Sequence, residues 1–157
     1  MTPSGSTLLF GAIPRQLKPE PGEKRALAQF VDLLCERVAD SRPFVCLLAN
    51  DAHLRRLNRK FLGHDYATDV LSFPTSGTAY EMGEMAISME RAAAQAAEFG
   101  HSCADEVRLL MLHGVLHLLG LDHRKGNATM ARAEKLWRVE FNLPKTLIAR
   151  AGNGAAR

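Results

Sequence analysis

Short apolar runs alternate along this chain with longer stretches whose apolar residues recur at helical spacing. The continuous run Phe44–Ala49 predicts a buried strand. Leu8–Phe10 predicts a short edge strand, and two more strands are expected at Asp69–Phe73 and Met85–Ser88, with a glycine-containing loop between them. The stretches between and after these runs predict helices at residues 23–39, at a basic segment capped by Asp51 and ended by Gly63, at Glu90–Phe99, and at 128–141.

A further helix is expected between Ser102 and Gly120, and its sequence is apolar on nearly all sides. Ser102, with Asp105 three residues later, resembles the start of a capping box. Gly120 stands where this helix would end, because glycine adopts the left-handed conformation of a helix stop without strain. Helices interleaved with four strands predict a small mixed sheet covered by helices, of the α+β or α/β class.

Three histidines lie in and just beyond this apolar helix, at the spacing that one metal ion requires. His113 and His117 are four residues apart, so their side chains are offset by about 40° around the axis and one turn along it. The turn at Gly120 can bring His123 back as a third ligand. Three protein ligands on a tetrahedral ion leave its fourth position open, which is typical of catalytic zinc. The spacing therefore predicts one Zn²⁺ per chain, with hydrolysis as the first reaction class to consider.

Isolated histidines are often ordinary core or surface residues. Unpaired imidazoles in so apolar a helix would each cost roughly 1 to 3 kcal/mol, so three at metal spacing favour ligands. His53, His64 and His101 lack this spacing and are expected on the surface or in loops, with His64 nearest the site.

The frame His-x3-His-x2-Gly-x2-His is that of the metzincin proteases, with one difference. Gly114 stands where those enzymes carry a glutamate as general base, and glycine cannot take a proton. This argues against a conventional protease. Asp122, beside the third histidine, is a candidate catalytic residue that would orient an imidazole or assist proton transfer. A role in ending the helix, or a loop hydrogen bond, is an equal alternative.

Composition fits one domain in a reducing compartment. The chain has 157 residues, 46% of them hydrophobic, and three widely spaced cysteines that suit core thiols. We expect a single metal-dependent hydrolase domain over residues 1–150 and a disordered tail at 151–157. The start lacks a signal-peptide pattern, and no apolar run reaches about 18 residues, so a cytoplasmic protein without membrane partners is expected.

The net charge of +3 is too small to indicate nucleic-acid binding, but the positive charges are unevenly distributed along the chain. Arg55, Arg56, Arg59 and Lys60 cluster in the basic helix, where they would attract phosphates without reading a base sequence. A solvated helix face explains the same cluster from charge alone.

Three segments match the motifs of one known family. They run from Leu57 to Pro74, from Gly83 to Ser88, and from Glu106 to His123. Together they are similar to the bacterial YbeY endoribonucleases, also called ribosomal RNA maturation factors. The last segment is specific enough to carry the resemblance, and the other two support it.

The resemblance implies that His113, His117 and His123 bind zinc. It implies an α+β fold with a small mixed four-stranded sheet, about five helices, and a central helix that carries the histidines. The implied activity is cleavage of single-stranded RNA in the maturation of small-subunit ribosomal RNA, including its 3′ end, and in ribosome quality control. The implied partners are ribosomal RNA, the small subunit and its assembly proteins.

The chain departs from the family motif at one position. The family carries an arginine directly after the aromatic residue of its Leu-Asn-x-x-aromatic segment, where it is thought to serve the active site. Here Leu62 follows Phe61. Arg59 lies within one helical turn, which makes it a substitute candidate for a catalytic cation.

Three functions therefore stand as hypotheses. The first is the zinc-dependent endoribonuclease. The second is a ribosome-assembly binding factor with a mainly structural zinc, whose phosphate contacts come from the basic helix. The third is an atypical metallohydrolase acting on a peptide or small molecule.

Overall fold

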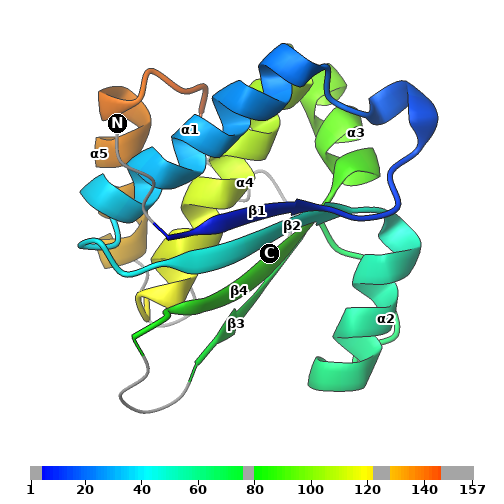
Figure 1. Ribbon diagram of the computed structural model, residues 1–157, viewed down its shortest axis with the longest axis horizontal. Helices are drawn as coiled ribbons and strands as arrows, with labels where there is room; N and C mark the ends of the chain where they lie inside the picture. Colours follow the sequence, from blue (N-terminus) through cyan, green and yellow to red (C-terminus); the bar gives the residue numbers. More distant parts are fainter. Residues whose placement is uncertain (1–4, 76–79, 122–127, 146–157) are drawn as a thin grey trace.

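The computed structural model describes residues 5–75, 80–121 and 128–145, and it consists of helices packed on both faces of one sheet (Figure 1). Its elements along the chain are β1 (Thr7–Phe10), the short 3-10 helix η1 (Arg15–Leu17), α1 (Pro21–Arg37), β2 (Phe44–Ala49), α2 (Asp51–Leu62), β3 (Val70–Pro74), β4 (Gly83–Ser88), α3 (Met89–Phe99), α4 (Cys103–Leu118) and α5 (Ala128–Glu140).

The four strands form one mixed sheet in the order β1-β2-β4-β3. β1, β2 and β4 run parallel, and β3 pairs antiparallel with β4, so that Ser72 lies opposite Met85. The α+β class and the small mixed sheet are thereby confirmed, and the first strand lies at an edge as the sequence predicts. Both outer strands, β1 and β3, are edges of this sheet.

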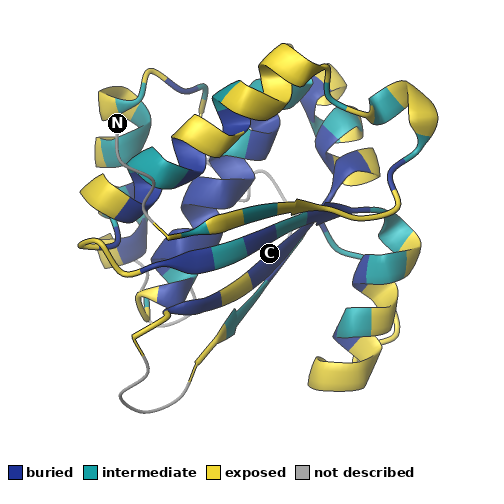
Figure 2. Cartoon of the chain, viewed as in Figure 1, coloured by how far each residue is buried: buried dark blue, intermediate teal, exposed yellow. Residues whose placement is uncertain are grey.

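α4 is the central helix of the molecule. It contacts β3 and β4 of the sheet and packs against α1, α3 and α5 (Figure 1). Figure 2 shows it buried along most of its length, which explains why its sequence is apolar on nearly all sides. α2 covers the opposite face of the sheet over a smaller core made by Ala49, Leu54, Leu71 and Ala86.

The predicted helix start at Asp51 is wrong by one residue. Asn50 is the N-cap, because its side chain accepts a hydrogen bond from the His53 amide at 2.8 Å. The Asp51 carboxylate instead accepts from the Ser88 hydroxyl at 2.6 Å and from Arg91 at 3.3 Å. Asp51 therefore joins the start of α2 to the end of β4.

The other predicted boundaries differ by one or two residues. α1 begins at Pro21 rather than residue 23, because Glu20 and Glu23 form a capping box, and it ends at Arg37. β3 and β4 are shifted or extended by one or two residues. At α4, Ser102 is the N-cap as expected, and its hydroxyl accepts from the Asp105 amide at 3.1 Å.

The predicted core thiols are largely confirmed. Cys35 and Cys46 are buried, Cys103 is half-buried, and none forms a disulfide. Burial raises the pKa of the Cys46 thiol, so this side chain behaves as a small apolar residue. No helix in the described ranges is long and apolar enough to cross a bilayer.

Candidate metal centre and its pocket

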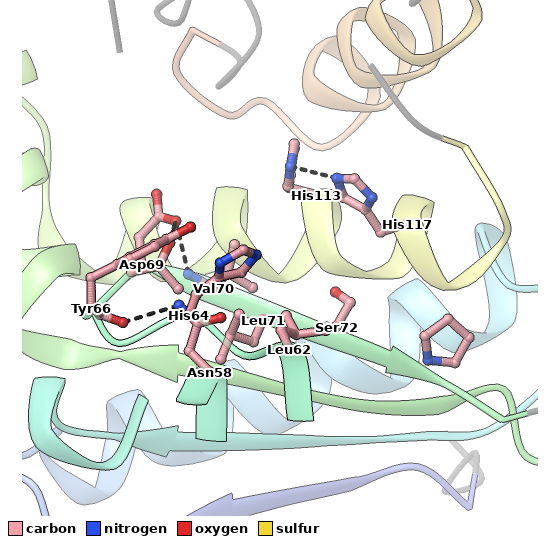
Figure 3. Close-up of a pocket in the computed structure, with 12 residues that line it drawn as sticks. Asn58, Leu62, His64, Tyr66, Asp69, Val70, Leu71, Ser72, His113 and His117 are labelled. Atoms are coloured by element: carbon pink, nitrogen blue, oxygen red, sulfur yellow. Dashed lines mark hydrogen bonds between the residues drawn. The ribbon is translucent and has the colours of Figure 1, made fainter. Parts of the chain in front are cut away.

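A pocket of about 290 Å³ lies beside the edge strand β3 (Figure 3). One wall comes from α4, another from the end of α2 and the loop that follows it, and β3 contributes the rest. Its size is at the lower end of the range of small-molecule sites. The lining residues are Asn58, Leu62, His64, Tyr66, Thr68, Asp69, Val70, Leu71, Ser72, Pro74, His113 and His117.

His113 and His117 project from consecutive turns of α4 into this pocket. Their Nε2 atoms are 3.0 Å apart and their ring centroids 4.6 Å apart. Two nitrogen lone pairs do not face each other at this distance without a proton or a cation between them. Tetrahedral zinc with Zn–N bonds of about 2.05 Å separates two ligand nitrogens by about 3.3 Å. The pair is thus close to the geometry of two ligands on one ion.

Glu134 on α5 holds the ring of His113. The Nδ1–H of His113 donates to Glu134 Oε1 at 3.0 Å, and both side chains are buried. A carboxylate at Nδ1 selects the tautomer whose Nε2 carries the lone pair, as at many metal sites. Sequence reasoning missed this residue. The available signal was an acidic side chain on the apolar face of the last helix, three residues before Trp137.

Gly120 ends α4 in the left-handed conformation, as the sequence predicts. This glycine has φ of +92°, and the next amide, of Leu121, donates to the Leu116 carbonyl at 3.1 Å, as in a helix stop. His123 and Asp122 come next and lie outside the described residues. Within the described residues, no group of three or more His, Cys, Asp or Glu side chains is arranged to hold a metal. Two converging imidazoles, one fixed by a carboxylate, fit zinc as far as the described donors go.

Gly114 faces the sheet and not the pocket. A Cβ at this position would lie 2.8 Å from the Sδ of Met85 and 3.4 Å from the Oγ of Ser72. The Ser72 hydroxyl also donates to the Gly114 carbonyl oxygen at 3.3 Å. The glycine therefore allows α4 to approach the sheet closely. A side chain at this position would have to displace the end of the Met85 side chain, and it would point toward the sheet rather than into the pocket.

Thr68, Asp69 and Ser72 line the pocket but are engaged in structural hydrogen bonds. The buried carboxylate of Asp69 accepts from the Val70 amide at 2.8 Å and from Gln95 at 3.1 Å. These bonds hold the start of β3 against α3. The Thr68 hydroxyl in turn donates to the Asp69 carboxylate at 3.4 Å, so these side chains serve the local structure.

The two positions discussed for a catalytic cation lie in different surroundings. Leu62 lines the pocket and is 48% exposed. Arg59 does not line it; its side chain is 63% exposed and lies 3.9 Å from Asp65. A catalytic role of Arg59 stays a prediction. His64 does line the pocket, as its predicted nearness to the site requires.

Comparisons with known proteins agree with this architecture. The family model described as Endoribonuclease YbeY matches residues 20–140. A protein named Endoribonuclease YbeY from Solibacter usitatus is 49% identical over 149 residues, which cover 95% of this chain and 97% of that protein. One of the same name from Helicobacter pylori is 42% identical over 73% of this chain and 82% of its own length.

A solved structure shares the fold. The solution structure of a protein from Thermotoga maritima matches 87% of this chain and 91% of its own, with a TM-score of 0.54 and 24% sequence identity. The family match extends over α1 to α5 and includes His113 and His117 of the pocket. This chain belongs to the YbeY endoribonuclease family.

Proposed function

We propose that this protein is a zinc-dependent, single-strand-specific endoribonuclease. It would act in the maturation of small-subunit ribosomal RNA, including its 3′ end, and in ribosome quality control. The observation that carries the proposal is the convergence of the His113 and His117 Nε2 atoms, 3.0 Å apart, inside a pocket. Family membership supplies the substrate class, since the relatives are named endoribonucleases.

His113, His117 and the predicted third ligand His123 would hold the zinc ion. The bound ion would supply a Lewis acid that activates water and offsets the negative charge that develops at phosphorus. Glu134 keeps the His113 ring in the orientation and tautomer that such a ligand needs. Asp122 stays the predicted candidate for moving a proton.

The basic face of α2 would bring the phosphates of the strand to the pocket. Asn58 and Leu62 of this helix line the pocket, and the exposed cations Arg56, Arg59 and Lys60 stand on the same helix. Such cations attract the backbone of a strand and contribute no base selectivity. Binding is therefore expected to weaken with added salt.

The first test is metal dependence with two forms of one RNA. The purified protein is stripped with a chelator, then assayed with and without added Zn²⁺ on a labelled single strand and on the same strand annealed to its complement. We expect cleavage of the single strand only when zinc is restored, and little cleavage of the duplex. Full activity of the metal-free protein, or equal cleavage of the duplex, would overturn the proposal.

The second candidate function is a ribosome-assembly binding factor, in which the zinc would be mainly structural. The observation that favours it is the exposure of the α2 cations outside the pocket lining. It predicts binding to small-subunit particles without any cleavage above background when zinc is restored.

Replacing Glu134 is expected to weaken zinc binding more than it weakens the fold. Glu134→Ala should lower zinc affinity by about 10- to 100-fold, because the His113 ring loses the acceptor that orients it. Glu134→Gln should lose less zinc affinity, because its amide oxygen can still accept the hydrogen bond from His113 Nδ1. Affinity is measured by competition with a chromogenic chelator, and folding by urea unfolding of the metal-free protein.

Glu140→Gln is the matched control. Glu140 lies on the same helix, is exposed, pairs with Arg37 at 2.9 Å, and does not line the pocket. It should bind zinc like the unaltered protein. Unchanged zinc affinity in Glu134→Ala would contradict the assigned role of the carboxylate.

A further inference from the structure

Two exposed aromatic rings stand at the mouth of the pocket, in the loop that follows α2. Tyr66 is 56% exposed and His64 is also exposed. The rings stack with centroids 5.4 Å apart and planes inclined by 29°. Both line the pocket whose far wall carries His113 and His117 (Figure 3). The stacked pair and the paired histidines therefore face one cavity.

The backbone that carries these rings is fixed to α2. The buried side chain of Asn58 donates to the Tyr66 carbonyl oxygen at 3.0 Å, and the His64 amide donates to the Asn58 carbonyl at 3.3 Å. Asp65, which lies between His64 and Tyr66 in the sequence, accepts two hydrogen bonds from Arg55, at 2.8 and 3.1 Å. These bonds lower the pKa of the Asp65 carboxyl below its usual range. The loop is therefore preorganised before any ligand arrives.

The chemistry of this rim suits a flat aromatic ligand attached to an anion. Leu62, His64 and Tyr66 offer apolar and aromatic surface to the pocket, and a phosphate alone gains little from such surface. The cations Arg59 and Lys60 lie one turn away on α2. A nucleotide combines both features. Unpaired bases of single-stranded nucleic acids stack on such side chains, whereas bases in a duplex are already stacked on their neighbours.

We propose that Tyr66, backed by His64, is a stacking platform for one unpaired nucleobase of the RNA strand whose phosphate lies at the histidine pair. This inference rests on the proposed function, because it places substrate RNA in the pocket. The platform is tolerant of base identity, since every base has an aromatic face. It favours single strands over duplexes.

The test uses a short single-stranded RNA in which one fluorescent 2-aminopurine is moved along the strand. Rapid mixing reads binding before cleavage. At one position the wild-type protein should quench the fluorescence, as stacking does. Tyr66→Ala should lose this quenching and bind about tenfold more weakly, within the range measured for stacked bases. Tyr66→Phe, which keeps the ring, should behave like wild type.

Tyr80→Ala is the matched control, because Tyr80 is the other tyrosine of the chain, is 72% exposed and does not line the pocket. It should quench and bind like wild type. An abasic residue at the quenched position should weaken RNA binding by the wild-type protein about tenfold. It should leave RNA binding by Tyr66→Ala unchanged. Circular dichroism checks that each variant is folded.

The outcomes separate this inference from the proposed function. If Tyr66→Ala quenches and binds like wild type, or loses affinity equally for the abasic strand, the platform is overturned even when RNA is cleaved. If wild type quenches with the expected pattern but never cleaves with zinc, the platform stands as a binding site and the endoribonuclease proposal fails.

Discussion

His117→Ala is expected to lose both the bound zinc and the cleavage of single-stranded RNA. Its imidazole supplies one of two Nε2 atoms that converge at 3.0 Å, so its removal leaves the predicted site one ligand short. His117 is half-buried, whereas His113 is buried and bonded to Glu134, so substitution at His117 disturbs the core less. Elemental analysis should fall from about one zinc per chain to near none. Cleavage should fall to that of a protein-free control.

His53→Ala is the matched control for this experiment. His53 lies on α2, outside the pocket lining, with its Nδ1 3.3 Å from Arg56. It should keep its zinc and its activity. If His117→Ala loses zinc but still cleaves RNA, the metal is not catalytic. If neither the unaltered protein nor His117→Ala cleaves RNA while both bind small-subunit particles, the binding-factor hypothesis takes precedence.

Gly114→Glu, which completes the metzincin pattern, is expected to unfold the protein more easily rather than to create a protease. A Cβ alone would lie 2.8 Å from the sulfur of Met85, which is itself fully buried. Overpacking of this kind costs about 1 to 3 kcal/mol, and a carboxylate between helix and sheet adds a desolvation cost of several more. We expect the free energy of unfolding to fall by at least about 3 kcal/mol.

Urea unfolding of the metal-free proteins measures this change. Gly22→Glu is the control, because Gly22 lies in the first turn of α1 and a Cβ there meets only Arg25, at 3.8 Å. An acidic residue in a first turn is favourable to the helix, so stability should be unchanged or slightly higher. A stable Gly114→Glu variant would contradict this expectation and would mean that the end of the Met85 side chain moves aside at little cost.

Several features of the fold followed from local patterns. The buried strand at Phe44–Ala49 and the apolar helix with its Ser102 cap were predicted correctly, because periodicity and capping depend on residues that are near in sequence. The error at Asp51 has the same origin. Asn50 and Asp51 are both good capping residues, and the contact of Asp51 with Ser88, 37 residues away, is not visible in the sequence.

The sequence by itself determined that two histidines share one face of an apolar helix, that a glycine ends that helix, and that the expected general base is absent. These conclusions need only helical geometry and the chemistry of single side chains. The tertiary structure alone decided that Glu134 holds His113, that Gly114 faces the sheet, and that Tyr66 shares a pocket with the histidines. Each of these contacts joins elements far apart in the chain, and their packing, rather than any local propensity, brings them together.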